Sequence, residues 1–159
     1  MKCSKLLLAA TLSVPFVAGA QLVSERTLSL NAARDAGWAA LERCRKDGYN
    51  VTATVLNKSG RTKAVMHDDN AGPHTLENSF KKAYTAITFK ANSGEFGKRI
   101  AAAPPPHAAL HLSNVTTAEG ALLIRSGNEI VGAIGVSGAP GGDKDAVCAQ
   151  AGIEAIKGL

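Results

Sequence analysis

The feature that most constrains the fold is a strand–turn–strand pattern that occurs twice, once in each half of the chain. Residues 51–56 alternate apolar residues with threonine, the polar turn 57–60 follows, and residues 61–67 continue as a second strand. The second copy has strand 121–125, turn 126–129 and strand 130–136. Strands joined by short turns pair antiparallel, so the sequence predicts a sheet built from two β-hairpins.

Apolar residues at helical spacing predict four helices around these hairpins, at residues 30–47, 75–88, 93–103 and 143–156. Each is preceded or opened by a residue suited to an N-cap, namely Ser29, Thr75, Ser93 and Asp143. Helices interspersed with hairpins indicate the α+β type of α/β fold, an antiparallel sheet flanked by helices. We expect the first and last helices to lie side by side on one sheet face.

The first twenty residues have the pattern of a secretory signal peptide. Lys2 and Lys5 precede an apolar run at residues 6–17, and Ala18-Gly19-Ala20 supplies the small residues of a cleavage site. A transmembrane anchor is the alternative, but the run is short for a bilayer and contains Pro15. We therefore predict a single domain at residues 21–159 that is periplasmic or secreted and not inserted in a membrane after cleavage.

The charge of the chain gives little support to nucleic-acid binding. Removal of Lys2 and Lys5, with no acidic residue beside them, lowers the formal net charge from +5 to +3. No basic run follows, and aromatic residues make up only 4% of the chain. Both features argue against a nucleic-acid partner.

Two cysteines, Cys44 and Cys148, remain after the predicted signal peptide. An even number of cysteines in an oxidising compartment indicates a disulfide. The two lie in the first and last predicted helices, and packing of these helices against each other would bring the thiols together. Two buried free thiols are the alternative. Thiol–disulfide catalysis is not indicated, because no Cys-x-x-Cys motif is present.

Several segments resemble the GlcG/HbpS family in their order and spacing. These are AGPHT at 71–75, KAYTA at 82–86, IVGAIGVSGA at 130–139, and GDKD followed by CAQAG at 142–152. The last pair is similar to the exported, cysteine-bearing members, and the resemblance extends over residues 28–159. It implies a profilin-like or PAS-like sandwich that forms homo-oligomers. It also implies haem as cofactor, with haem breakdown or redox sensing in some members.

A haem site needs an axial ligand, an apolar slot for the ring, and cations or amides for the propionates. His67 at the end of a predicted strand and His74 in the next loop are the ligands we consider first. The alternatives are that His67 is a surface residue beside Asp68 and that His74 only bonds nearby backbone. Further possible ligands in the sequence are Met66, Tyr84, His107 and His111.

The resemblance also implies that Ser93 contacts haem, and we predict Arg99 as a second contact from its position on the next helix. Ser93 stands where the family places a hydroxyl before its third helix, although Asn92-Ser93 here replaces the family's Pro-Thr. Lys98 and Arg99 follow on the predicted helix, where a cation is suited to a propionate. The alternatives are a helix N-cap for Ser93 and ordinary solvent-exposed cations.

Three other patterns in the sequence are possible sites. His107 and His111 are spaced to share a helix face, which would suit a divalent metal. The glycine-rich loop 137–142 precedes a predicted helix and could present amides to an anion, or could be only a tight turn. Gly132 and Gly135 in a predicted strand indicate close approach of backbone or ligand.

Taken together, these patterns predict an exported haem-binding protein that stores, scavenges or senses haem. One alternative is an enzyme that degrades haem or acts on another small molecule in the same cleft. The other is a non-catalytic oligomeric module that binds a different ligand. No Gly-x-Ser-x-Gly motif is present, and no catalytic residue is assigned.

Overall fold

The computed structural model describes residues 21–158 of the 159-residue chain, so the predicted signal peptide lies outside the described residues. The elements in chain order are α1 (Leu30–Lys46), β1 (Thr52–Asn57), β2 (Thr62–His67), α2 (His74–Phe89), α3 (Ser93–Ala102), the 3₁₀ turn η1 (Ala108–His111), β3 (Ala121–Ser126), β4 (Glu129–Ser137) and α4 (Gly142–Ala155). No helix in this part of the chain has the length and apolar character needed to cross a membrane.

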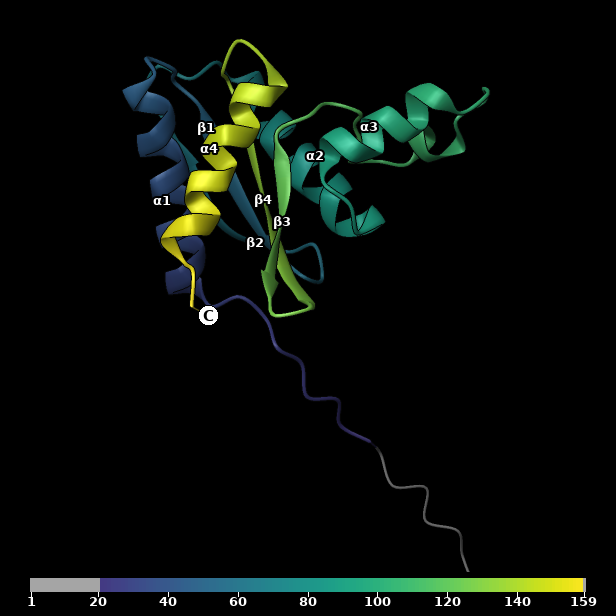
Figure 1. Cartoon of the computed structure of the whole chain (residues 1–159), viewed down its shortest axis with the longest axis horizontal. Helices are drawn as coiled ribbons and strands as arrows, with labels where there is room; N and C mark the ends of the chain where they lie inside the picture. The colour runs from purple at the N-terminus through teal and green to yellow at the C-terminus, as the bar shows by residue number, and fades with distance from the viewer. Residues whose placement is uncertain (1–20, 159) are drawn as a thin grey trace, which may run out of the picture.

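The four strands form one antiparallel sheet in the order β2-β1-β4-β3. Each predicted hairpin is present, and the two hairpins join through pairing of β1 with β4. Helices α1 and α4 lie side by side on one face, α2 covers the other, and α3 extends away from the sheet (Figure 1). The predicted α+β class and the antiparallel sheet are therefore confirmed.

Small residues allow the helices to approach the sheet closely on both faces. Ala33, Ala36 and Ala40 of α1 are fully buried against α4 and the sheet. On the other face, Ala83 and Ala86 of α2 pack on Leu56 and Ala133 in a second, smaller core. The heavy use of alanine and glycine thus produces two thin, closely packed layers.

Gly135 shows why β4 carries glycine where it meets α2. A Cβ atom at this position would lie 2.8 Å from Ala83 N and 3.0 Å from Ala83 Cβ, and it would also meet the Ser79 carbonyl oxygen. The backbone of α2 therefore rests directly on β4. The close approach predicted at Gly135 is one of backbone on backbone.

Cys44 of α1 and Cys148 of α4 form a disulfide with their Cα atoms 5.5 Å apart. This confirms the predicted pairing of the first and last helices and excludes the alternative of two free thiols. The bridge connects residues separated by 104 positions.

Three of the four predicted N-caps are wrong. Ser29 does cap α1, since its hydroxyl accepts from Ala32 N at 3.2 Å. Asn92, not Ser93, caps α3 and forms a capping box with Glu95. Helices α2 and α4 begin after Pro73 and Gly141, with no side-chain cap, so the predicted caps Thr75 and Asp143 lie inside the first turns. Pro73 suits its position because its ring fixes φ near the observed −59°, whereas Gly141 has extended backbone with φ −151° and ψ 152°, which any residue can adopt.

Candidate functional site

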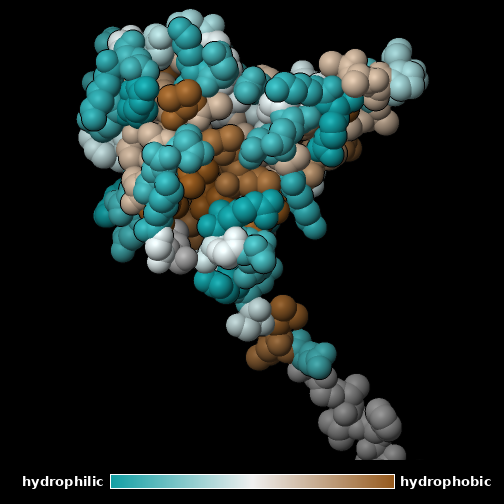
Figure 2. All heavy atoms as spheres, in the orientation of Figure 1, coloured by the Kyte–Doolittle hydropathy of each residue, from teal (hydrophilic) through white to brown (hydrophobic). Residues whose placement is uncertain are grey.

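Two hollows lined by described residues have volumes of about 550 and 540 Å³, enough for a small molecule. The first, which we call the β3 groove, has a volume of about 550 Å³ and lies along the edge strand β3 between α3 and the C-terminal half of α4. Its lining residues are Lys90, Ala91, Asn92, Glu95, Leu122, Leu123, Arg125, Gln150, Ile153 and Lys157. Figure 2 shows apolar atoms gathered between α4 and α3, with hydrophilic side chains around them.

The β3 groove has an apolar floor that crosses the edge of the sheet, and a cationic rim. Leu122 and Leu123 are partly exposed, and as consecutive residues of β3 they lie on opposite faces, Leu122 beside the α1–α4 core and Leu123 beside the α2 core. Three cations lie around the groove, from Lys90 just after α2, Arg125 on β3 and Lys157 just after α4. Such a surface suits a flat apolar ligand that carries carboxylates.

Lys90 reaches this rim from an unusual backbone position. It follows the last residue of α2 with φ 52° and ψ 37°, the left-handed conformation in which glycine is normally found. A side chain in this conformation costs about 1 kcal/mol relative to glycine. Lys90 therefore presents its cation to the groove from a backbone position that lowers stability.

Asn92 and Ser93 at the start of α3 cover the outer edge of β3. The Ser93 hydroxyl accepts from Ala121 N at 2.9 Å, and Asn92 Oδ1 accepts from Leu123 N at 3.1 Å. Ser93 is fully buried and does not line the β3 groove, whereas Asn92 does. The hydroxyl that the family resemblance singled out therefore holds the edge strand in place beside the groove.

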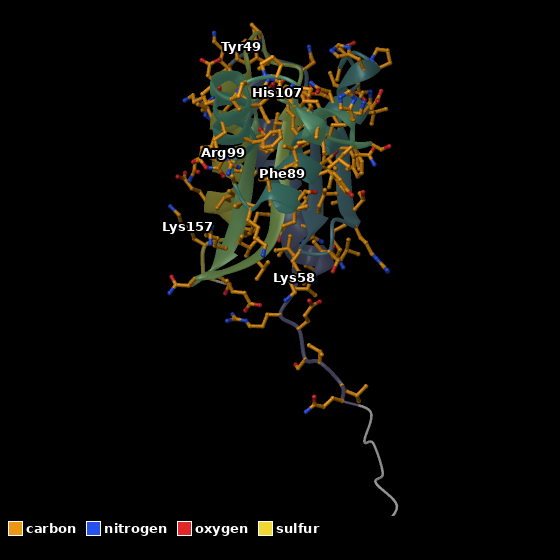
Figure 3. The ribbon with its side chains drawn as sticks, turned by 90° about the vertical axis from the view of Figure 1, so that its right-hand side faces the viewer. Tyr49, Lys58, Phe89, Arg99, His107 and Lys157 are labelled. Carbon is orange, nitrogen blue, oxygen red and sulfur yellow. A yellow bond between two sulfur atoms is a disulfide. The ribbon has the colours of Figure 1, made fainter. Side chains whose placement is uncertain are left out.

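Arg99 lies one helical turn beyond Glu95 on α3, so both side chains project from the same face of the helix. It is exposed, and its guanidinium carbon lies 5.9 Å from the centre of the Phe96 ring. Arg99 and Lys157 lie on the same side of the molecule (Figure 3). Arg99 does not line the β3 groove, and its contact with a propionate stays a prediction.

The second hollow, which we call the polar pocket, has a volume of about 540 Å³. It is enclosed by the α1–β1 loop, the start of α2 and the β4–α4 loop. Its lining residues are Gly48, Tyr49, Asn50, Asn70, Gly72, His74, Thr75, Asn78, Lys82, Ser137, Gly138, Ala139, Pro140, Gly141, Gly142 and Asp145. The glycine-rich loop 137–142 thus forms one wall of a pocket.

A buried ion pair forms the base of the polar pocket. Lys82 Nζ donates to Asp145 Oδ2 at 2.7 Å and to Val136 O at 3.0 Å, and each charged side chain is at most 4% exposed. Asp145 Oδ1 accepts from Ala139 N at 3.0 Å. Burial raises the pKa of the Asp145 carboxyl, and the Lys82 ammonium opposes that rise.

Sequence reasoning missed this pair. Lys82 and Asp145 lie 63 positions apart, on α2 and α4, and each resembles an ordinary helix-surface charge in the sequence. The only local signal is that each falls within a segment that resembles the family.

The two histidines predicted as haem ligands lie near one end of the sheet but do not line one pocket. His74 is exposed and lines the polar pocket, where its ring packs on Gly72. His67 is exposed at the end of β2, and its Nδ1 lies 2.6 Å from Thr52 Oγ1. Thr52 in turn contacts the Thr75 hydroxyl at 2.6 Å. Their role as haem ligands stays a prediction.

His107 and His111 do not share the face of an α-helix. His107 precedes the 3₁₀ turn η1 and His111 is its last residue, and in a 3₁₀ helix residues four apart point in different directions. Among residues 21–158, no group of three or more histidine, cysteine or acidic side chains is placed to hold a metal ion.

Comparisons with known proteins agree with the resemblance seen in the sequence. A family profile described as "Haem degrading protein HbpS-like" matches residues 28–154. The crystal structure of HbpS is 34% identical with a TM-score of 0.81, and the match covers 87% of this chain and 96% of that one. A double Glu-to-Asp variant of Streptomyces reticuli HbpS is 32% identical with a TM-score of 0.81, covering 94% and 98%.

A more distant structure is a complex of PduOC with haem, 25% identical with a TM-score of 0.76, for which the match covers 82% of this chain and 96% of that one. A search of curated proteins gives no significant match. The family profile covers most of the chain, and HbpS is matched over nearly its whole length. The chain therefore belongs to the HbpS-like haem-binding family.

Proposed function

We propose that this chain is an exported haem-binding protein that takes haem in the β3 groove, for storage, scavenging or sensing. The observation that carries the proposal is the apolar floor of the groove beneath a rim of three cations. Membership of the HbpS-like family and the haem complex of PduOC support the choice of ligand.

The groove residues fit the parts of haem separately. The porphyrin ring would lie across the edge of β3, with Leu122 and Ile153 toward one sheet face and Leu123 toward the other. Lys90, Arg125 and Lys157 would pair with the propionates. The exposed Arg99, on the same side of the molecule as Lys157, is a further candidate for such a pair. The volume of about 550 Å³ lies in the range of small-molecule sites.

The groove offers the iron only weak ligands from its own wall. None of its described lining residues is a histidine, cysteine, methionine or tyrosine, the usual axial ligands of haem iron. Asn92, Glu95 and Gln150 supply oxygen atoms instead. Weak ligation favours reversible uptake and release of haem over catalysis on it.

Hemin titration of residues 21–159, followed by the Soret band, tests this proposal. Leu123→Glu places a charge on the groove floor and should weaken binding by about tenfold or more, which corresponds to about 1.4 kcal/mol. Val65→Glu is the matched control, since Val65 is 44% exposed on β2 at the opposite edge of the sheet. Unchanged hemin affinity in Leu123→Glu would overturn the groove as the site.

The same titration tests the histidines. If His67→Ala or His74→Ala abolishes the Soret shift while Leu123→Glu does not, haem binds at the other end of the sheet. If none of these variants differs from wild type, hemin binding is non-specific and the proposal fails.

Oxidative haem breakdown is the second candidate, favoured by the description of the family as haem-degrading. Haem supplies the redox-active iron for such chemistry. Loss of the Soret band with release of iron, in the presence of a reductant or peroxide, would support catalysis. A stable Soret band under these conditions would leave binding as the function.

Export and self-assembly are parts of the same proposal. Mass spectrometry of the protein recovered from the periplasm or medium should give an N-terminus near Gln21. Light scattering of the mature chain should give a mass above that of one copy. Retention of residues 1–20 would contradict export with cleavage, and a monomeric mass would contradict the homo-oligomer.

A further inference from the structure

The polar pocket is a second hollow that the haem proposal does not use. It shares no lining residue with the β3 groove. Tyr49 lies on its wall, at the end of the molecule opposite the β1–β2 turn that contains Lys58 (Figure 3). Its walls are mainly polar side chains and the backbone of loop 137–142, so it does not suit the porphyrin ring.

Lys82 has one donor left for a ligand. An ammonium group carries three N–H donors. Within the described residues, Nζ donates to two acceptors, Asp145 Oδ2 and Val136 O. Lys82 lines the pocket although it is only 3% exposed, so its third N–H is available there and shielded from bulk water.

Ser137 supplies a second buried donor. Its hydroxyl oxygen accepts from Asn78 Nδ2 at 2.9 Å, which leaves the hydroxyl proton free to be donated. Ser137 is 3% exposed and also lines the pocket. Donors from α2 and from the end of β4 therefore meet in one cavity.

The one carboxylate in the lining is already neutralised. Both oxygens of Asp145 accept hydrogen bonds, from Lys82 and from Ala139 N. The first amides of α4, at Gly142 and Asp143, have no acceptor within the helix and add positive potential at the same wall. Lys144 lies beside the rim, with Nζ 3.2 Å from the Tyr49 hydroxyl.

We propose that the polar pocket binds the oxyanion group of a small polar molecule, a carboxylate or a phosphate, between Lys82, Ser137 and the start of α4. The argument rests on the donors, because Lys82 Nζ and the Ser137 hydroxyl each keep one N–H or O–H while both oxygens of Asp145 already accept a hydrogen bond. An oxyanion supplies the missing acceptors in a site with little competing water. The volume of about 540 Å³ leaves room for the rest of a small metabolite.

Titration of the ¹⁵N-labelled mature chain with inorganic phosphate, and separately with citrate, tests the proposal. Saturable amide shifts confined to loop 137–142 and residues 78–82 are expected with at least one of the two anions. Phosphate alone would identify a phosphate ligand, and citrate alone a carboxylate. Absence of saturable shifts with both anions, or shifts spread over the surface lysines, would overturn the proposal.

Ser137→Ala removes one donor while leaving the Lys82–Asp145 pair intact, so this variant should fold. It should weaken the anion affinity by about tenfold, the effect of losing one hydrogen bond to a charged group. Ser59→Ala, at an exposed position in the β1–β2 turn, is the matched control and should bind as wild type. Equal affinity of Ser137→Ala and wild type would contradict the assigned site. Hemin binding should be unchanged in Ser137→Ala, which keeps this test separate from the haem proposal.

Discussion

His67 Nδ1 lies 2.6 Å from the Thr52 hydroxyl. The hydrogen bonds that link His67 to Thr52 and Thr75 determine which ring nitrogen of the neutral imidazole carries the proton. Thr75 donates its only hydroxyl proton to Gly72 O, so Thr52 must donate to Thr75. Thr52 then has no proton left for His67, and His67 must donate through Nδ1. In the neutral imidazole, Nε2 therefore carries the lone pair.

NMR of the histidine side chains checks this assignment. At neutral pH the neutral form of His67 should carry its proton on Nδ1, and Thr52→Val should give a mixture of the two tautomers. His111, an exposed residue of η1, serves as the control ring. A proton on Nε2 of neutral His67 in the wild-type protein would contradict the hydrogen-bond chain.

Asp68 should contribute to stability at neutral pH and lose that contribution in acid. Arg45 donates to both Asp68 oxygens at 2.9 Å, and this contact holds the pKa of the Asp68 carboxyl below its usual range. A carboxyl with a lowered folded pKa stabilises the fold above its unfolded pKa of about 3.9. The contribution disappears as the pH falls through the lower, folded pKa.

Asp68→Asn should therefore lower the free energy of unfolding by about 1–3 kcal/mol at pH 7, with a smaller difference in acid. Urea unfolding at a series of pH values measures this. Asp69→Asn, at the exposed neighbouring position, should change little. A pH-independent difference between Asp68→Asn and wild type would show that ionisation is not the cause.

Lys90→Gly should raise stability and weaken hemin binding together. Glycine relieves the left-handed backbone at this position, by about 1 kcal/mol, and removes a cation from the β3 groove. Asn114→Gly is the matched control, since Asn114 has φ 67° and does not line the groove. Urea unfolding and hemin titration report the two effects. Unweakened hemin binding in Lys90→Gly would remove the role proposed for this cation.

Gly135→Ala should destabilise the protein by about 1–3 kcal/mol, because the new methyl group meets the backbone of α2. Gly37→Ala is a milder test, since its methyl group would meet the Met66 side chain, 3.1 Å from Cγ, which can move aside. The midpoints of urea unfolding should fall further for Gly135→Ala. Equal midpoints would mean that α2 shifts without strain.

Removal of the disulfide should be the most destabilising of these changes. A covalent loop of 104 residues restricts the unfolded chain by about 4–5 kcal/mol in the chain-entropy description. The double variant Cys44→Ala, Cys148→Ala should unfold at a correspondingly lower urea concentration. Wild-type protein under reducing conditions should behave like this variant, and a difference between the two would point to packing of the alanines.

Features that depend on local pattern could be predicted from the sequence. The turn residues and strand alternation gave both hairpins, and the helical stripes that contain Cys44 and Cys148 gave the pairing of α1 with α4. The N-caps could not be predicted in this way, because α2 and α4 begin after Pro73 and Gly141 with no side-chain cap bond that a sequence pattern could reveal.

The hollows could not be predicted in the same way, because their walls come from distant segments. The β3 groove requires Asn92 and Ser93 to bond the edge of a strand about 30 residues later. The polar pocket requires Lys82 to meet Asp145, and a charged residue on a helix surface looks the same in sequence with or without such a partner. Only the packed structure distinguishes these cases.

The position of the disulfide has a consequence for chain cleavage. All four strands, together with α2 and α3, lie between Cys44 and Cys148. The exposed connection at residues 112–114, between η1 and β3, is the kind of segment that proteases cut. A single cut there would leave two fragments still tied by the sulfur bridge and still interleaved in one sheet. The nicked molecule would migrate as an intact chain on a gel until a reductant released its halves.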